Sequence, residues 1–332
     1  MSVDLSVVIP LYNEAPNIPE LYRELRSALQ ATGRTYEIIL VDDGSTDETY
    51  ALAAGLHADD PQVVVVQLRR NFGQTAAFAA GFAKARGRII VTSDGDLQND
   101  PADIATLLAK LDDEDYDIVC GWRRDRKDPW LTKCLPSKIA NWLISVTTGV
   151  HLHDYGCSLK AFRSEVVKPL RLYGELHRFI PAIASEQGVR VAELVVNHRP
   201  RKFGRSKYGL SRTIRVVFDL VTVKFLLSYS TRPLQIFGPV GLFLGLIGGG
   251  IVGYLGYIRI FSAQAIGDRP LLLLGIFMVF TGIQFITIGL LAELQARTYH
   301  ESQDKPIYVV RRVLDAAPSM AKADGQVAIE GN

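Results

Sequence analysis

Two carboxylates, Asp94 and Asp96, lie one residue apart in the DXD-like segment VTSDGDLQNDP, directly after an apolar run that ends at Ser93. Residues i and i+2 of an extended chain point to the same side, so both side chains can face one cation. Two hard carboxylates suit Mg²⁺ or Mn²⁺ and leave room for phosphate oxygens. The alternative is an Asp-Gly turn with a helix cap at Asp100, but it leaves the second carboxylate and Gln98 unexplained. The segment therefore predicts a divalent-metal site.

Spacing excludes other metal and phosphate motifs. A calcium loop that started at Asp94 would need Gly at its sixth position and Glu at its twelfth, where the chain has Asn99 and Ala105. No GxxxxGK[ST] segment occurs in the sequence, which excludes a P-loop protein. A GxGxxG match at residues 248–253 lies inside an apolar segment with no strand before it, so we regard it as accidental.

The elements that must position Asp94 and Asp96 alternate between strand and helix patterns. Short apolar runs predict strands at residues 5–10, 36–42, 63–68, 88–93 and 117–121. Helix patterns begin near residue 17, with Glu20 completing a capping box, and near residues 47, 75 and 101. Continuous apolar strands are typical of a parallel sheet that is covered on both faces. The pattern predicts an α/β domain that binds its ligand beyond the carboxyl ends of the strands.

Polar segments follow the ends of other predicted strands in this domain. Tyr12 to Glu14 follow the first strand, and Asp42 and Asp43 end the second. One of these two aspartates can form a turn and cap the next helix, which leaves the other free to meet a ligand. We therefore expect these segments to converge with Asp94 and Asp96 in one crevice.

Basic residues gather in two loops that contain Gly or Pro. Most such residues are simply solvated, but opposite an acidic crevice they suit phosphate groups on a donor and an acceptor. They are Arg123, Arg124, Arg126, Lys133, Arg201, Arg205 and Lys207.

Hydropathy divides the chain of 332 residues, whose net charge of +2 is uninformative. Residues 233–258 and 270–292 contain no charged residue, and each run is long enough to cross a bilayer as a helix. Core helices of a soluble domain are the alternative, which two such runs in tandem make less plausible. Residues 209–232 predict an amphipathic helix that lies along the membrane or packs on the domain. The glycines at 241, 245, 249 and 253 predict close helix packing, within the chain or between subunits.

Charge placement predicts the orientation. Basic residues dominate positions 199–232, which favours the cytosolic side of an inner membrane. The first residues lack the basic start of a secretory signal, and three cysteines without ligand spacing fit reduced thiols. We expect both termini in the cytosol, with a polar tail at 298–332 whose end is disordered.

Six segments together resemble the family 2 glycosyltransferases that act on polyisoprenyl phosphates. They are VVIPLYNE, VDDGSTDET, RNFGQTAA, SDGDLQNDP, DYGCSLKAFR and RPRKFGRSKYGL. Bacterial bactoprenol glucosyltransferases are the nearest subgroup, and dolichyl-phosphate mannose synthase is more distant. The resemblance implies a glycosyltransferase-A type domain, Rossmann-like with a mostly parallel sheet, over residues 1–208. Interfacial helices and a two-helix transmembrane hairpin at 233–297 would follow it.

The resemblance also implies roles for individual residues. The nucleotide sugar would contact Pro10, Tyr12, Glu14, Asp42, Asp43 and Gln98. The metal and diphosphate would contact Asp94, Asp96 and Gln98. Phosphate groups would meet Arg123, Arg124, Lys133 and Ser137, and Asp154 would lie by the acceptor. The catalytic loop that closes over the site would carry Arg201, Ser206 and Lys207. Two residues depart from the family pattern, Gly95 for the more frequent Ala and Lys133 for Arg.

These features predict an enzyme that transfers a hexose, with glucose from UDP-glucose as first choice, to undecaprenyl phosphate for a cell-envelope glycan. The family inverts the anomeric centre by direct displacement. Because a phosphomonoester has a second pKa of about 6, the acceptor is already a nucleophile and needs no strong base. Catalysis then depends on positioning and on stabilising the leaving diphosphate.

Three alternatives are compatible with parts of the pattern: a mannose synthase that uses GDP-mannose, a processive polysaccharide synthase, and a non-catalytic membrane protein that binds nucleotide sugars. A processive synthase would need an additional base and usually more membrane spans. The carboxylate pair and the basic loops argue against a non-catalytic protein. We expect a homo-oligomer that binds no nucleic acid.

Overall fold

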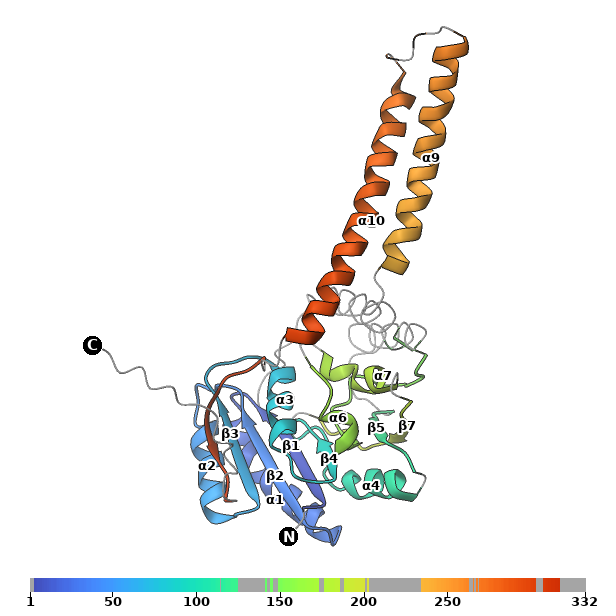
Figure 1. Ribbon diagram of the computed structural model, residues 1–332. Coiled ribbons are helices and arrows are strands. Elements are labelled where there is room, and N and C mark those ends of the chain that lie inside the picture. The colour runs from blue at the N-terminus through green and yellow to red at the C-terminus, as the bar shows by residue number, and fades with distance from the viewer. Residues whose placement is uncertain are drawn as a thin grey trace, which may run out of the picture. The chain divides into compact units, whose positions relative to one another are not determined.

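The computed structural model describes residues 3–113, 115–124, 141, 144–145, 149–172, 176–185, 188–200, 202, 234–262, 265, 267, 269–302 and 307–316. The chain divides into two compact units (Figure 1). The first comprises Met1–Asp219 together with Pro306–Asn332, and the second comprises Leu220–Lys305.

The first unit is built on an eight-stranded sheet in the order β7-β5-β6-β4-β1-β2-β3-β8. The strands are β1 (Leu5–Leu11), β2 (Tyr36–Asp42), β3 (Val63–Leu68), β4 (Ile89–Thr92), β5 (Ile118–Trp122), β6 (Lys160–Arg163), β7 (Val191–Val195) and β8 (Val310–Leu314). Neighbouring strands are parallel except where β6 pairs with β4 and β5 and where β8 pairs with β3. The predicted α/β class is confirmed, and the five predicted strands lie within one residue of their expected ends.

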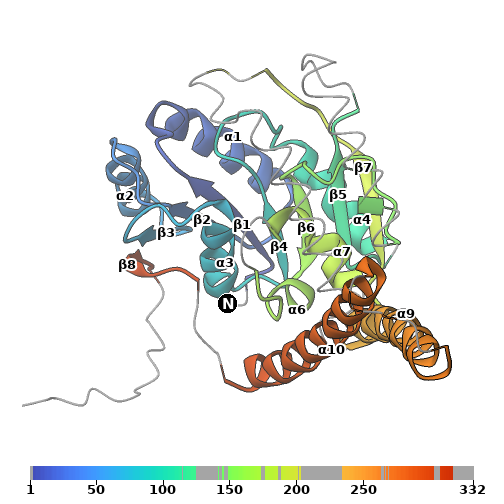
Figure 2. The same cartoon turned by 90° about the horizontal axis from the view of Figure 1, so that it is seen from above.

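Helices cover both faces of this sheet (Figure 2). They are α1 (Ile18–Ala31), α2 (Thr49–Asp59), α3 (Gln74–Lys84), α4 (Asp103–Asp113), α6 (Ser164–Val167) and α7 (Ile180–Ser185), with the short helices η1 (Ala15–Asn17) and η3 (Leu176–Arg178). The core on one face joins β1 and β2 to α1 and α4. On the other face α3 packs closely, because Gly81 faces Val8 of β1 and a Cβ there would clash with it.

Helix α1 shows how the sequence pattern produces the packing. Its buried residues are spaced three or four apart and form one apolar stripe. The predicted capping box is wrong, because the Asn17 side chain makes no capping bond and donates instead to Glu14 Oε2 at 2.6 Å. Glu20 accepts from Lys202 Nζ at 2.8 Å rather than from the backbone. A proline in the first turn is pre-organised for the helix start.

The tail after the second unit returns to the sheet. Strand β8 pairs antiparallel with β3, so Val313 lies opposite Val66. The backbone N–H of Arg69 donates to the carbonyl of Val309 at 2.9 Å, and Arg86 Nη1 donates to Asp315 Oδ1 at 2.9 Å. The sequence pattern did not indicate this strand. Residues 317–332 lie outside the described part of the chain.

The second unit consists of α9 (Leu234–Phe261) and α10 (Pro270–Ser302). Residues Phe237–Phe261 and Pro270–Leu291 are long and apolar enough to cross a membrane. The helices pack at glycines, because a Cβ on Gly241 or Gly248 would lie 2.6 Å from the carbonyl oxygen of Gly282 or Gly275, respectively. A Cβ on Gly249 would meet nothing within 4 Å, so only part of the predicted glycine stripe packs within the hairpin. The predicted amphipathic helix at 209–232 lies outside the described residues.

Candidate active site

Sheet topology brings the predicted site segments to one edge. The strands β1, β2, β3, β4, β5 and β7 share one direction, so their carboxyl ends lie on the same side of the sheet. Strand β6 runs the opposite way, so the segment that precedes it also reaches this edge. Pro10 lies within β1, and Tyr12 to Glu14 follow it directly.

Hydrogen bonds join these strand-end loops. The backbone N–H groups of Asn13 and Glu14 donate to Ser45 Oγ at 3.0 Å and Thr49 Oγ1 at 2.9 Å. Asn13 itself has φ of 52°, a left-handed conformation that is uncommon outside glycine and is frequent at functional sites. The convergence predicted for the β1 and β2 loops is therefore present.

Asp42 and Asp43 are both buried and both hold loops. Asp42 Oδ1 accepts from the backbone N–H of Ser45 at 3.0 Å. Asp43 accepts from the backbone N–H groups of Phe72 at 2.8 Å and Gly73 at 2.9 Å. Burial raises the pKa of the Asp43 carboxyl, although these two bonds oppose the shift. Asp43 thus anchors the loop after β3 to the end of β2.

The DXD carboxylates lie in a tight turn after β4. Asp94 Oδ1 accepts from Gln74 Nε2 at 2.7 Å, and Asp96 Oδ1 accepts from the backbone N–H of Gln98 at 3.2 Å. Between Asp96 and Gln98, Leu97 has φ of 61° and is buried. The strained turn fixes Asp96, and the first residue of α3 fixes Asp94. Sequence reasoning missed Gln74, although it lies in the RNFGQTAA segment.

This donor set fits a divalent cation that is shared with a substrate. Among the described residues, no three His, Cys, Asp or Glu side chains are grouped to hold a metal by themselves. Asp94 and Asp96 offer two carboxylates, which is the usual protein share of a Mg²⁺ site completed by substrate phosphates and water. Gln98 contacts Asp96 through its backbone N–H.

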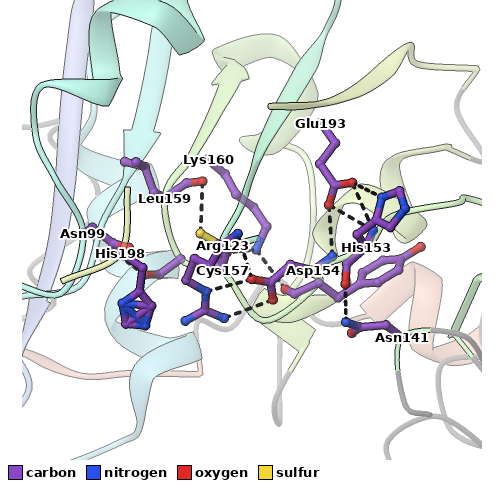
Figure 3. A network of polar contacts seen from close by, with 12 residues as sticks. Asn99, Arg123, Asn141, His153, Asp154, Cys157, Leu159, Lys160, Glu193 and His198 are labelled. Carbon is purple, nitrogen blue, oxygen red and sulfur yellow. Dashed lines mark hydrogen bonds and ion pairs between the residues drawn. The ribbon is translucent and has the colours of Figure 1, made fainter. Parts of the chain in front are cut away.

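An ion pair between the half-buried Arg123 and the buried Asp154 lies at the same edge (Figure 3). Arg123 follows β5, and its Nε and Nη2 donate to Asp154 Oδ2 at 2.7 Å and Oδ1 at 3.0 Å. Burial alone would lower the pKa of Arg123, but Asp154 and, more weakly, Asp94 raise it above its ordinary value. Arg123 and Asp94 both follow strands, β5 and β4, whose carboxyl ends lie at this edge of the sheet. Gly156 leaves room for the guanidinium, since a Cβ there would lie 3.3 Å from Arg123 Nη2.

The loop that carries Asp154 is tied to the DXD segment. Asn99 Nδ2 donates to Ser158 Oγ at 2.8 Å, and Thr92 Oγ1 donates to the Ser158 carbonyl at 2.6 Å. The buried Lys160 ammonium donates to the carbonyl of Tyr155 at 3.1 Å. Burial raises the pKa of the Cys157 thiol to about 11, so this thiol is protonated near neutral pH.

The structure describes eleven of the predicted site residues and places them at the strand-end loops of this edge. They are Pro10, Tyr12, Glu14, Asp42, Asp43, Asp94, Asp96, Gln98, Arg123, Arg124 and Asp154. Arg124 is exposed, and its backbone N–H donates to the carbonyl of Trp122 at 2.9 Å. The predicted residues Lys133, Ser137, Arg201, Ser206 and Lys207 lie outside the described part of the chain.

Comparison with known proteins gives the family. The model of glycosyl transferase family 2 matches residues 6–171. Dodecaprenyl-phosphate galacturonate synthase of Rhizobium johnstonii is 44% identical, over 95% of this chain and 94% of that protein. Undecaprenyl-phosphate 4-deoxy-4-formamido-L-arabinose transferase of Enterobacter sp. is 38% identical, over 97% of each chain.

A solved structure agrees at the level of the fold. Glucosyl-3-phosphoglycerate synthase of Mycobacterium tuberculosis, in complex with Mn²⁺ and UDP-glucose, matches 67% of this chain and 79% of its own, with a TM-score of 0.53 and 18% identity. The glycosyltransferase-A fold is thereby confirmed. The chain belongs to glycosyl transferase family 2 and, within it, to the polyprenyl-phosphate glycosyltransferases.

Proposed function

We propose that this enzyme transfers a sugar from a nucleotide diphosphate sugar to a long-chain polyprenyl phosphate at a membrane surface, with inversion at the anomeric carbon. The observation that carries the proposal is that Asp94, Asp96 and the Arg123 guanidinium all follow strand ends at one edge of the sheet. A diphosphate leaving group needs a cation held by carboxylates, and an anionic acceptor needs a fixed positive charge.

Asp94 and Asp96 are the proposed ligands of a divalent cation, Mg²⁺ or Mn²⁺. Such a cation, when bound, neutralises charge that develops on the departing diphosphate. Gln74 orients Asp94, and the turn at Leu97 orients Asp96. Arg123 presents N–H donors to a phosphate, while Asp154 fixes the plane of the guanidinium. No side chain is needed as a strong base, because a phosphomonoester loses its second proton at about pH 6.

The sugar is proposed from the relatives. The 44% identical relative is named for galacturonate and the 38% identical one for a formamido-arabinose, and neither name mentions glucose. Nearly full-length similarity to the first makes a UDP-linked hexuronic acid, galacturonate above all, the first donor to test. UDP-glucose, the choice from sequence alone, becomes the second.

The membrane is the proposed location, with the nucleotide-sugar domain on the cytosolic side. The two apolar helices α9 and α10 follow that domain, and the chain after α10 rejoins the domain's own sheet through β8. A hairpin whose two ends both lead to one domain has both ends in one compartment. The basic residues that precede α9 favour the cytosol.

A donor panel tests this function. The purified chain in lipid nanodiscs is incubated with polyprenyl phosphate, Mg²⁺ or Mn²⁺, and labelled UDP-galacturonate, UDP-glucose or GDP-mannose, and the lipid is extracted. We expect one UDP-sugar to label the lipid in a metal-dependent reaction that needs the lipid phosphate. Transfer from none of them, or transfer without the lipid phosphate, would contradict the proposal.

A further inference from the structure

Glu193 lies in the middle of β7, opposite Cys120 of β5, and the function proposed above gives it no role. Its carboxylate accepts from the backbone N–H of His153 at 3.0 Å and from that of Asp154 at 3.0 Å. It also lies 2.8 Å from His153 Nδ1, which donates to it in the tautomer that carries its proton there. Three N–H groups of two consecutive residues therefore meet one carboxylate (Figure 3).

These contacts fix the peptide that precedes the Asp154 side chain. Asn141 Nδ2 donates to the carbonyl oxygen of His153 from a different segment. The His153 ring stacks on Trp122, with 4.2 Å between ring centroids and 17° between planes. Trp122 is the residue directly before Arg123. Glu193 thus holds the backbone beside Asp154, and its partner His153 contacts the side chain of the residue before Arg123.

We propose that Glu193 is a positioning residue for sugar transfer. By holding the amides of His153 and Asp154, it sets the direction of the Asp154 carboxylate and, through the two-point ion pair, the plane of the Arg123 guanidinium. Rotation of the 153–154 peptide would break one of the two bonds between Arg123 and Asp154. The guanidinium would then turn away from the edge where Asp94 lies. The inference rests on the proposed function in one respect, namely that Arg123 binds a phosphate group of the substrate.

A carboxylate suits this position better than an amide. Glu193 has two acceptor oxygens for three N–H groups, whereas glutamine would offer one oxygen and turn an NH₂ group toward N–H donors. Glu193→Gln keeps the volume and removes this match. Glu165→Gln is the matched control, because Glu165 is an exposed residue in the first turn of α6, outside the network.

Hydrogen exchange tests the positioning without any substrate. Peptides that cover residues 150–158 are followed by mass spectrometry in the wild type, Glu193→Gln and Glu165→Gln. We expect faster exchange in this segment for Glu193→Gln alone, with β1 to β4 unchanged. Unchanged exchange at residues 150–158 would overturn the proposal, whatever sugar the enzyme transfers.

Kinetics test whether the positioning acts through Arg123. We expect Glu193→Gln to lower kcat by about 10- to 100-fold, since a displacement of about 1 Å can have an effect of that order. The affinity for Mn²⁺ and UDP should stay within about two-fold, because Glu193 bonds to His153 and Asp154 and not to Asp94 or Asp96. The double variant Glu193→Gln/Arg123→Lys should have a kcat only slightly lower than that of Arg123→Lys alone. Two results would overturn the proposal. One is that the losses in kcat of Glu193→Gln and Arg123→Lys are fully additive in the double variant. The other is that Glu193→Gln lowers the affinity for Mn²⁺ as much as it lowers kcat.

If Glu193→Gln does not fold, His153→Ala is the second variant that tests the positioning proposal. It removes one of the three donors and keeps both backbone N–H groups, so we expect a loss of a few-fold in kcat that vanishes in the Arg123→Lys background. Full activity of His153→Ala, or a loss that persists in that background, would overturn the proposal. A wild type that transfers no sugar contradicts the proposed function and leaves hydrogen exchange as the test of Glu193.

Discussion

Two charged residues of the candidate site, Asp94 and Arg123, are oriented by partners from other elements. Asp94 after β4 is held by Gln74 of α3, and Arg123 after β5 is held by Asp154 of the loop before β6. Fixed donors and charges of this kind stabilise a transition state without reorganising during the reaction. The site therefore depends on the residues that orient its charged groups as well as on the charged groups themselves.

Gln74 provides the simplest test of this dependence. Gln74→Ala leaves Asp94 free to rotate, and loss of a contact that orients a metal ligand typically weakens metal binding by about 10- to 100-fold. We expect a loss in that range for Mn²⁺ in the presence of UDP, measured by electron paramagnetic resonance. Gln62→Ala, at an exposed position, serves as the control. Equal Mn²⁺ affinity in both variants would show that Gln74 does not orient the ligand.

The buried thiols give a prediction about pH. Burial raises the pKa of Cys120 to about 12 and that of Cys157 to about 11, so both remain protonated at pH 8. Because the thiolate is the reactive form, neither should react with a disulfide reagent in the folded protein. We expect at most one thiol, Cys134, to titrate at pH 8 and all three after denaturation. Reaction of two or three in the native state would contradict the burial of Cys120 and Cys157.

Sequence reasoning found the residues whose signal is local and missed those whose signal is not. Asp94 and Asp96 were recognisable because two carboxylates lie one residue apart directly after an apolar run, although the structure places them in a turn and not in extended chain. The partner Gln74 lies twenty residues from Asp94, and Glu193 lies 39 residues from Asp154. The packing of α3 on the sheet brings Gln74 to Asp94, and the pairing of β7 with β5 brings Glu193 to Asp154, and no spacing rule in a single sequence reports either contact.

At the scale of elements, burial explains which strands could be predicted. The central strands β1, β2 and β3 are covered on both faces and read as continuous apolar runs. Strand β6, with the sequence KAFR, carries charged ends and pairs antiparallel between β4 and β5. Strand β8, with the sequence VRRVL, lies at an edge and is partly exposed. Neither resembles a buried parallel strand, so both escaped prediction.

Strand β8 should stabilise the edge of the sheet. Val313→Pro removes a backbone N–H and introduces a ring opposite Val66, which should lower the free energy of unfolding by about 1–3 kcal/mol. Exchange of the β3 amides at residues 63–68 should rise in the same variant. Val313→Thr, which keeps the backbone N–H and a β-branched side chain, should leave β3 protected. If the β3 amides exchange as slowly in Val313→Pro as in the wild type, the result would contradict the pairing of β8 with β3.

The whole molecule joins a glycosyltransferase domain to a helical hairpin, and the chain that leaves the hairpin rejoins the sheet of that domain through β8. A polyprenyl phosphate keeps its phosphate at the membrane surface, so an enzyme that uses it benefits from being anchored there. The two apolar segments were predictable from their length and lack of charge. The return of the chain to the sheet was not predictable, because it depends on the pairing of β8 with β3, which lie far apart in sequence.

This connectivity predicts the topology. A single cysteine at Gly267, between α9 and α10, should be labelled by an impermeant maleimide on intact cells when Cys134 is replaced by serine. A tag placed after Asn332 should be reached only after the cells are opened, because β8 keeps the tail with the domain. Protection of both positions, or exposure of both, would show that the two helices do not form a simple hairpin across the membrane.

The most direct test of the account is sugar transfer by Asp94→Asn and Asp96→Asn with the donor that serves the wild type. Formation of the lipid-linked monosaccharide is followed by mass spectrometry, with Asp113→Asn at the exposed end of α4 as the control. We predict that both DXD variants lose metal-dependent transfer by at least about 100-fold while the control retains it, because the leaving diphosphate loses its main stabilisation. Transfer at the wild-type rate by both variants would contradict the assignment of the reaction to this edge of the sheet.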